Sequence, residues 1–425
     1  MFERSQPLDV YRDLTLAVLD SCQLVQTICL EDVNQTLTLH VPAGDMKYDS
    51  FWVRDAAMMA SSGLISASVL AGWLRLIACA GQNGDHERLL EHQLKIPAWA
   101  IADHINYDGR PVFFPGTYSS GQDQGNGRCG FYPPQDDASY FIDIANQYLK
   151  QGGSASYFST RMNGLTLLDR LERAFQSIQI DPHTQLCISS LPEYAVDWGF
   201  CDVIVKSGLL LFPSILRYQA ARQLQQIIQV VQNVRSETKA AFYADLAAKI
   251  QQSVKKQFAD PSGSGWLLSA TEVGRQKDVW GTAFAIWTGI LDGELQTAAL
   301  RAIRQAYLDG SAVSYGYVRH ILEGDDAHPG TSAWQQTSCP YNTYQNGGFW
   351  ATPTGWFAYA LAQADPDLAA RMLNAFYQDW QAKEAQGAPY EWRSRDGSVV
   401  DGKRYGASAA LPYAALTRLR TEHLI

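Results

Sequence analysis

Apolar residues recur at three- and four-residue steps over most of the chain, which is the spacing of one face of an α-helix. Together with ambiguous stretches between Arg54 and Ile105, this pattern predicts about a dozen helices. The repeat extends over Leu8–Cys29, Ala138–Lys150, Tyr157–Ile178, Val203–Val234, Lys239–Phe258, Trp280–Leu291, Glu294–Leu308, Gly355–Ala364, Asp367–Gln381 and Ala407–Leu419.

Strand-like alternation is confined to short segments. Thr36–Val41 alternates well, and pieces near Pro111–Phe114 and Ala312–Tyr317 fit short strands. The Gly-rich stretch Gly121–Gly130 is brief and has helical patterns on both sides, so we interpret it as a loop inside a domain. No motif recurs with the period of a helical repeat protein. The sequence therefore predicts one all-α domain over residues 1–425, a closed double ring of helices with a few short strands in loops.

The composition of the chain restricts the expected ligands more than it restricts the expected fold. The net charge is −9, which gives no electrostatic reason to bind nucleic acid or an anionic membrane, and a small or neutral ligand is expected instead. The chain has 12 Trp and 21 Tyr residues, and such rings can stack on sugar C–H faces, although most of them are expected to be core. The sequence leaves a homo-oligomer open.

The cysteines and the N-terminal segment indicate the compartment. There are seven cysteines with no C-x-x-C pair, so neither a disulfide framework nor a zinc ribbon is indicated. The first residues carry acidic side chains and no apolar stretch of signal-peptide length. No uncharged apolar run is long enough to cross a bilayer. We expect a cytoplasmic protein, and neither a metal nor a cofactor is expected because the histidines do not cluster.

Four segments gather aromatic, glycine, amide and carboxylate residues where ordinary helices do not need them: Tyr48–Ala56, Leu191–Asp202, Tyr341–Trp356 and Pro389–Ala409. In the first, Arg54 and Asp55 have aromatic neighbours Tyr48 and Trp52, although a carboxylate at a helix start can also serve the helix dipole. These segments are the candidate walls of a polar pocket.

Asp197 lies between Val196 and Trp198, and burial against an aromatic ring raises a carboxyl pKa as a general acid requires. A helix N-cap explains the same residue without any catalysis. Glu193 is the rival acid, because a spacing of four residues places both carboxylates on one helical face.

Glu391 lies between aromatic residues, with Arg393 and Arg395 near enough in sequence to keep it ionised as a general base or to form a surface ion pair. Two carboxyl groups, one donating a proton and one activating water, are the minimal machinery for cleaving a glycosidic bond. Nucleophile-elbow, zinc-helix, Walker and dinucleotide motifs are absent. Further candidates for the pocket wall are Asp136, Asp137, Trp198, Gln345, Asn346, Trp350 and Trp392.

In order along the chain, the four segments resemble the six-hairpin glycosidases, whose fold is an (α/α)6 barrel. The local likeness is greatest to the neutral/alkaline invertases: Tyr48–Asp55 is similar to their Y-D-x-V-F-V-R-D, Val196–Gly199 to V-D-S-G, and Tyr344–Trp350 to Y-H-N-G-G-S-W. Pro389–Gly397 occupies the place of W-P-E-Y-Y-D-G. Glucoamylases, trehalases and glucosylglycerate hydrolases are relatives.

The resemblance implies an inverting hydrolase of a small glucoside or disaccharide, such as sucrose or glucosylglycerate. It carries over Asp197 as general acid, Glu391 as general base and Asp55 as a sugar ligand. Tyr390 separates Pro389 from Glu391, so the base is left open between Glu391 and a neighbouring residue. Trp198 replaces the serine of the family beside the acid, which places sucrose specificity in doubt.

Two other functions fit the same fold. A disaccharide phosphorylase would need a phosphate subsite in place of an ionised base, and a non-catalytic sugar-binding scaffold would bind without turnover. A sugar 2-epimerase is disfavoured because it would be expected to rely on histidine pairs.

Overall fold

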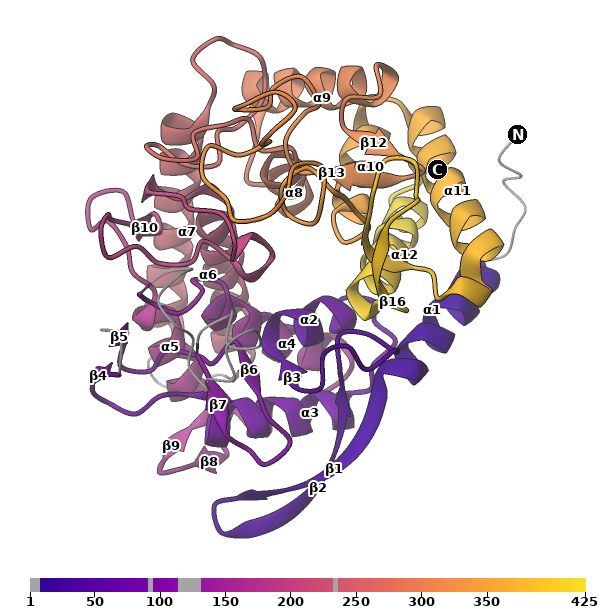
Figure 1. The fold of residues 1–425 in the computed structure, drawn as a ribbon. Helices are drawn as coiled ribbons and strands as arrows, with labels where there is room; N and C mark the ends of the chain where they lie inside the picture. Colours follow the sequence, from indigo (N-terminus) through magenta and orange to yellow (C-terminus); the bar gives the residue numbers. More distant parts are fainter. Residues whose placement is uncertain (1–7, 91–94, 114–130, 232–235) are drawn as a thin grey trace.

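The computed structural model describes residues 8–90, 95–113, 131–231 and 236–425, and within them the chain forms twelve α-helices arranged as a ring (Figure 1). The helices are α1 (Leu8–Cys22), α2 (Val53–Ala60), α3 (Ala67–Leu76), α4 (Asp137–Lys150), α5 (Leu167–Ser177), α6 (Leu211–Val231), α7 (Ser236–Phe258), α8 (Val279–Thr288), α9 (Gly293–Leu308), α10 (Thr354–Ala364), α11 (Pro366–Lys383) and α12 (Gly406–Thr421).

The even-numbered helices contact one another in succession, from α2 through α4, α6, α8 and α10 to α12, and α12 contacts α2. The odd-numbered helices pack on the outside of this series: α1 on α12, α3 and α5 on α4, α7 on α6, and α9 and α11 on α10. Figure 1 shows α12 lying close to α2 although they are far apart in the sequence.

Burial follows this arrangement. All eight residues of α2 are buried, and nine of the eleven residues of α10 are. In α9, by contrast, only Ala299, Ile303 and Ala306 are buried, three and four residues apart on one stripe. A helix that is apolar on every side must be surrounded by protein, whereas a striped helix covers a core from outside. In the described part of the chain, no helix has the length and apolarity to span a membrane.

The strands are short and lie mostly in connections. β1 (Gln23–Leu30) and β2 (Val33–His40) form a hairpin, and β3 (Phe51–Trp52), β6 (His104–Ile105) and β7 (Pro111–Val112) form a small sheet. Three further pairs join β4 (Arg88–Leu89) with β5 (Lys95–Ile96), β8 (Arg161–Met162) with β9 (Leu165–Thr166), and β10 (Ile188–Ser189) with β11 (Gly208–Leu209).

The largest sheet has five antiparallel strands in sequence order, β12 (Val313–Ser314), β13 (Tyr317–Arg319), β14 (Phe349–Trp350), β15 (Tyr390–Arg393) and β16 (Val400–Lys403). It pairs Trp350 with Trp392, and Trp392 with Asp401. This sheet therefore joins two of the candidate segments, Tyr341–Trp356 and Pro389–Ala409, side by side.

Most predicted helices are confirmed within a few residues, but three of them include other structure. The helix predicted over Tyr157–Ile178 begins at Leu167, after a 3-10 turn and strands β8 and β9. The helix predicted over Leu8–Cys29 ends at Cys22, and the remainder belongs to strand β1. The helix predicted from Val203 begins at Leu211, after a turn and β11. The strand predicted over Thr36–Val41 is most of β2, and the pieces near Pro111 and Ala312 contain β7 and β12. The predicted loop Gly121–Gly130 lies outside the described residues.

Gly355 provides a test of the contact between α10 and α12. A β-carbon at this position would lie 2.4 Å from the backbone oxygen of Leu411 in α12, so an alanine forces two backbones apart. The overpacking outweighs the better helix propensity of alanine, and we expect Gly355→Ala to lower the free energy of unfolding by about 1–2 kcal/mol. Gly84→Ala is the control, because nothing lies within 4 Å of its added carbon. Equal denaturation midpoints for the two variants would contradict close packing here.

Candidate active site

One pocket gathers residues from all four candidate segments. The space around its lining, including the part open to solvent, is about 330 Å³. Its walls come from the start of α2, the turn before α6, the loop before β14, strand β15 and the start of α12. The lining residues are Pro42, Tyr48, Trp52, Arg54, Asp55, Gly199, Phe200, Asp202, Tyr344, Glu391 and Tyr405.

Glu391 reaches this pocket from β15, whose neighbours in the sheet fix its position. Its Oε2 accepts a hydrogen bond of 2.7 Å from the Tyr48 hydroxyl, and Lys47 Nζ lies 3.6 Å away. Burial raises the pKa of Glu391 to about 7, against the lowering effects of Lys47 and of the Tyr48 hydrogen bond. Gly402 on β16 leaves room for this side chain, since a β-carbon there would lie 2.4 Å from Glu391 Cβ.

Asp202 is a second carboxyl group on the same pocket. It follows the short 3-10 turn Gly199–Cys201, and burial raises its pKa to about 6. Gln345 Nε2 donates to Asp202 Oδ1 at 2.5 Å, and Gln345 Oε1 accepts from the backbone N–H of Val203 at 3.1 Å. Because the amide N–H occupies Oδ1, a proton on this carboxyl group is carried by Oδ2. The arrangement suits a proton donor.

Arg54 lies beneath the pocket and is surrounded by carboxylates. Its Nη1 is 3.1 Å from Asp103, 3.5 Å from Asp136 and 3.9 Å from Asp137, and its Nε is 3.9 Å from Asp55. All five side chains are almost completely buried. No group of three or more His, Cys, Asp or Glu side chains in the described ranges is arranged to hold a metal ion. The guanidinium is therefore the counter-charge of this cluster.

The aspartates around Arg54 are not equivalent. Burial raises the pKa of Asp55 to about 6 although Arg54 and a 2.6 Å hydrogen bond from the Tyr405 hydroxyl oppose it. Burial raises the pKa of Asp136 to about 6 as well, and burial together with the neighbouring carboxylates raises that of Asp137 well above its usual value. For Asp103, Arg54 and His104 outweigh burial and hold the pKa below its usual value. The single positive charge of Arg54 is therefore not enough to keep all four surrounding aspartates ionised.

Gly199 explains how the turn before Asp202 fits against Arg54. A β-carbon at Gly199 would lie 1.6 Å from Arg54 Nη1, so only glycine permits this approach. The Gly199 backbone N–H donates to Asp136 Oδ2 at 3.1 Å, and the guanidinium carbon lies 5.0 Å from the centre of the Phe200 ring. Arg54 thus holds together the starts of α2 and α4 and the turn that carries Asp202.

Asp197, the general acid proposed from the sequence, lies outside the pocket lining. Its Oδ2 accepts from Lys206 Nζ, and both side chains are almost completely buried. Burial alone would lower the pKa of Lys206, but Asp197 beside it raises that pKa above its usual value. Burial raises the pKa of Asp197 as well, against the lowering effect of Lys206. The structure thus places Asp197 against Lys206 and away from the pocket that Glu391 lines, and its role as general acid stays a prediction. Glu193, the rival acid, pairs with Lys95 at the surface.

Three predicted tryptophans also belong to the core. Trp198 stacks on Phe212 at 3.8 Å between ring centres, and its Nε1 donates to Cys201 Sγ. Trp350 is fully buried, and its Nε1 donates to the backbone oxygen of Tyr344. Trp392 is also buried and lies beside Tyr344. These rings pack between elements and do not line the pocket, and sugar contacts for them stay a prediction.

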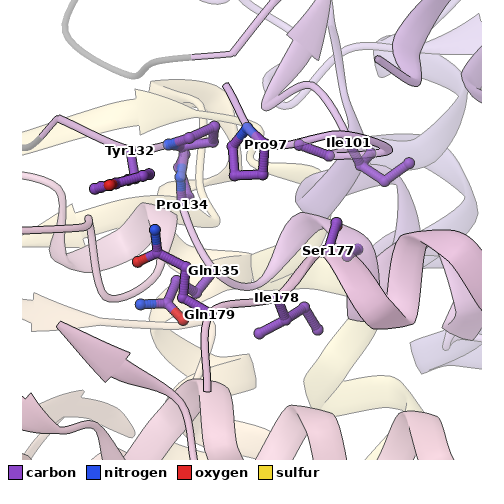
Figure 2. Close-up of a pocket in the computed structure, with 11 residues that line it drawn as sticks. Pro97, Ile101, Tyr132, Pro134, Gln135, Ser177, Ile178 and Gln179 are labelled. Carbon is purple, nitrogen blue, oxygen red and sulfur yellow. The ribbon is translucent and has the colours of Figure 1, made fainter. Parts of the chain in front are cut away.

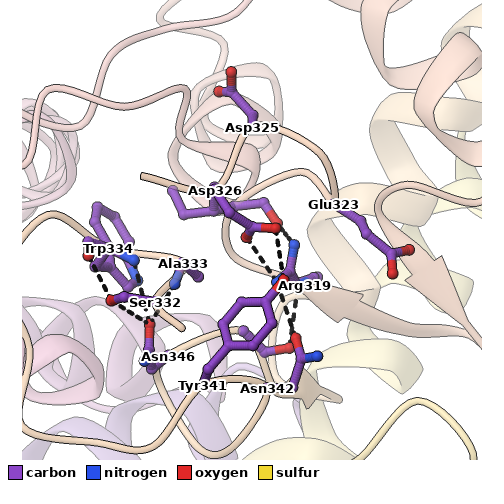
Figure 3. Close-up of polar contacts among 12 residues, drawn as sticks. Arg319, Glu323, Asp325, Asp326, Ser332, Ala333, Trp334, Tyr341, Asn342 and Asn346 are labelled. Carbon is purple, nitrogen blue, oxygen red and sulfur yellow. Dashed lines mark hydrogen bonds and ion pairs between the residues drawn. The ribbon is translucent and has the colours of Figure 1, made fainter. Parts of the chain in front are cut away.

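Asn346 is a structural residue as well (Figure 3). Its Oδ1 accepts from the backbone N–H groups of Ala333 and Trp334, and its Nδ2 donates to the backbone oxygen of Cys339. Arg319 fastens the same loop through Asp326 at 2.8 Å and Asn342 at 3.1 Å. The Asn346 amide thus holds the loop, and the Gln345 amide contacts the pocket residue Asp202.

The structure therefore brings together Tyr48, Trp52, Arg54, Asp55 and Glu391 as the sequence predicted, while Asp136 and Asp137 lie behind Arg54 instead of at the pocket surface. Sequence reasoning missed the pocket residues Asp202, Tyr344 and Tyr405. Each of these residues lies inside one of the four candidate segments. The sequence therefore located the segments, but only the structure shows which residues within them face the pocket.

A second pocket is lined mainly by apolar and proline side chains (Figure 2). Its lining includes Pro97, Ile101, Tyr132, Pro134 and Ile178, with the amide side chains of Gln135 and Gln179. No carboxylate is among its lining residues in the described part of the chain, so it offers no acid–base chemistry.

The aspartates around Arg54 predict how stability depends on pH. Because their carboxyl pKa values are raised, the folded state holds these protons more tightly than the unfolded state, whose aspartates titrate near pH 4. Stability therefore falls as the pH rises from about 4 through the folded values. Asp137→Asn removes one of these groups, so we expect a shallower decline and a variant more stable than wild type at pH 8.

Urea unfolding at several pH values measures this effect. Asp245→Asn is the control, since Asp245 is exposed in the middle of α7. An unchanged slope for Asp137→Asn would contradict the charge assignment.

Comparison with known proteins gives no match by sequence, either to a protein family or to a curated protein. Solved structures do match. An uncharacterized conserved protein from Thermus thermophilus matches with a TM-score of 0.58 and 14% identity, covering 96% of this chain and 99% of that one. A GH63 mannosylglycerate hydrolase from the same organism, in complex with glucose, matches with a TM-score of 0.57 and 14% identity, with the same coverage. A rhamnosidase from Klebsiella oxytoca with rhamnose bound has a TM-score of 0.56 and 11% identity, covering 99% of this chain and 65% of that one. The chain thus has the fold of these glycoside hydrolases.

Proposed function

We propose that this protein hydrolyses the glycosidic bond of a small glucoside or disaccharide, with Glu391 as general base and Asp202 as general acid. One observation carries the proposal: both carboxyl groups line one pocket, and the pKa of each is raised toward neutrality, to about 7 and about 6. Such values allow a proton to be held or accepted near neutral pH.

The proposed reaction is an inverting hydrolysis. Asp202 donates its proton to the glycosidic oxygen as the bond from that oxygen to C1 breaks. Glu391 takes a proton from a water molecule, and this water attacks C1 from the opposite face of the ring. The Tyr48 hydroxyl, which donates to Glu391 Oε2, orients the base.

Sugar binding is assigned to the other side of the pocket. Asp55 accepts from the Tyr405 hydroxyl through Oδ1, and its Oδ2, which lies 3.9 Å from Arg54 Nε, is assigned to a sugar hydroxyl. Trp52, Tyr48 and Tyr344 supply aromatic surface, and such rings pack against the C–H faces of sugars. The glucose found in the GH63 mannosylglycerate hydrolase supports a monosaccharide in the cleavage subsite.

The fold is proposed to be a single (α/α)6 barrel. The succession of contacts among the six even-numbered helices, ending with α12 against α2, supports closure of an inner ring. The likeness to neutral/alkaline invertases rests on the sequence motifs alone, so sucrose is one candidate substrate beside glucosylglycerate, glucosylglycerol, trehalose and short maltooligosaccharides.

A panel of these five substrates tests the function. We expect one of them to release glucose at neutral pH without phosphate, and NMR of the fresh product to show the anomer opposite to that of the substrate. Retention of the anomeric configuration would contradict the inverting mechanism. Release that requires phosphate would favour a phosphorylase, and binding without any release would favour a sugar-binding scaffold.

Substitution of the carboxylates tests the residue assignments. We expect Asp202→Asn and Glu391→Gln each to lower kcat by at least ~100-fold, because each removes a proton-transfer group. Asp197→Asn is the matched variant: it leaves Lys206 buried without its partner and costs stability, about 3–5 kcal/mol, while folded enzyme keeps its kcat. A folded Asp197→Asn protein without activity, beside an active Asp202→Asn protein, would return the acid role to Asp197.

A further inference from the structure

The loop that precedes β3 is fastened to the segment that follows β15. Gly406 N–H donates to Pro42 O at 2.7 Å, and Gly44 N–H donates to Arg404 O at 3.0 Å. Further along, the Lys403 N–H donates to Asp45 Oδ2 at 3.2 Å. These contacts hold the next residues of the loop, Lys47 and Tyr48, beside Glu391.

At the end of this series of contacts, the ammonium group of Lys47 lies between two carboxylates. Its Nζ lies 2.7 Å from Asp401 Oδ2 on β16 and 3.6 Å from Glu391 Oε2 on β15. The Lys47 side chain is about one third exposed, at 34%, and that of Glu391 is buried. One ammonium group is therefore shared between a surface carboxylate and the residue proposed as general base.

We propose that Lys47 is a positioning residue that keeps Glu391 ionised for base catalysis, and that Asp401 limits this effect by holding the same ammonium group. The proposal rests on the proposed function for the role of Glu391. The charge interaction between Lys47 and Glu391 can be measured in the folded protein without any catalytic activity.

Lys47 differs from the other groups around Glu391 in the sign of its charge. Burial favours the neutral acid, and the negative charges of Asp55 and Asp401 act in the same direction. Tyr48 donates a hydrogen bond that favours the carboxylate, and Tyr344 and Tyr405 lie near as neutral hydroxyl groups. Of the described charged groups with the largest effects on Glu391, Lys47 is the cation.

The two neighbours of Glu391 should therefore act in opposite directions. Loss of the Lys47 charge removes a favourable interaction at 3.6 Å, screened because Lys47 is partly exposed, and a shift of roughly one pH unit upward is expected. Loss of the Asp401 charge removes a repulsion and releases the ammonium toward Glu391, so the titration moves downward.

Carbon-13 NMR of protein labelled at the glutamate side-chain carboxyl groups measures this directly, with Glu391→Gln to assign the signal. We expect Lys47→Gln to raise the midpoint of the Glu391 titration by roughly one pH unit and Asp401→Asn to lower it by a fraction of a unit. Lys47→Arg keeps the charge and should restore most of the wild-type value. Lys403→Gln is the matched control, because it removes a positive charge from β16, the strand of Asp401, at a residue that is not paired with Glu391. It should leave the midpoint of the Glu391 titration unchanged.

Equal shifts for Lys47→Gln and Lys403→Gln would overturn the proposal, since general surface charge would then explain them. An upward shift for Asp401→Asn would overturn the part assigned to Asp401. Far-UV circular dichroism of each variant verifies the fold before titration.

The kinetic counterpart uses the glycosyl fluoride of the sugar identified in the substrate panel, because fluoride departs without a proton donor. The acidic limb of kcat/KM should then move with the NMR midpoint in each variant. NMR shifts without matching kinetic shifts would contradict the role of Glu391 as base while leaving its electrostatic coupling to Lys47 intact. The two failures are thereby distinguished.

Discussion

The buried guanidinium of Arg54 is the interaction on which the rest of the site depends. Four aspartates from three parts of the chain lie around it, and the turn at Gly199 packs directly on it. A single positive charge thus joins the starts of α2 and α4 to the turn before Asp202. Removing one partner of a buried ion pair costs far more than a surface pair, because the remaining charges stay in a medium of low dielectric constant. The same cluster sets the depth of the pocket, since Arg54 forms part of its lining.

Environment, more than residue type, separates the acids of this protein. Asp197 and Asp202 are five residues apart, yet Asp197 pairs with Lys206 in the core while Asp202 accepts a hydrogen bond from the Gln345 amide at the pocket. Burial raises the pKa of both carboxyl groups, and the ammonium group of Lys206 opposes this at Asp197, whereas an amide donor and the charge of Arg54 oppose it at Asp202. Glu391 lies between these cases, with a tyrosine hydroxyl and a partly exposed lysine beside it.

The sequence predicts most helices because their apolar periodicity reflects burial that the ring imposes. The helix prediction fails where one apolar pattern is compatible with two kinds of element: the apolar residues after Cys22 fit a helical face, but they form strand β1. Within the site, the structure places Arg54, Asp55 and Glu391, which the sequence proposed, in the lining of one pocket. Asp197 lies outside that lining because its partner, Lys206, holds it in the core, and Lys206 lies further along the chain and carries no motif. Trp198 and Trp350 are buried in the core, which the sequence could not foresee, since a large aromatic ring fits a core and a sugar pocket equally well.

The pocket walls are far apart in sequence, because Pro42 to Asp55 come early, Gly199 to Asp202 and Tyr344 follow, and Glu391 and Tyr405 come last. During synthesis, the early part of the site therefore exists long before the late part. The aspartates around Arg54 are all present once α4 has been made, but the proposed general base and the Tyr405 hydroxyl that contacts Asp55 have to wait for β15 and the start of α12. A chain truncated before Glu391 would keep the buried charge cluster and lack the late wall of the pocket.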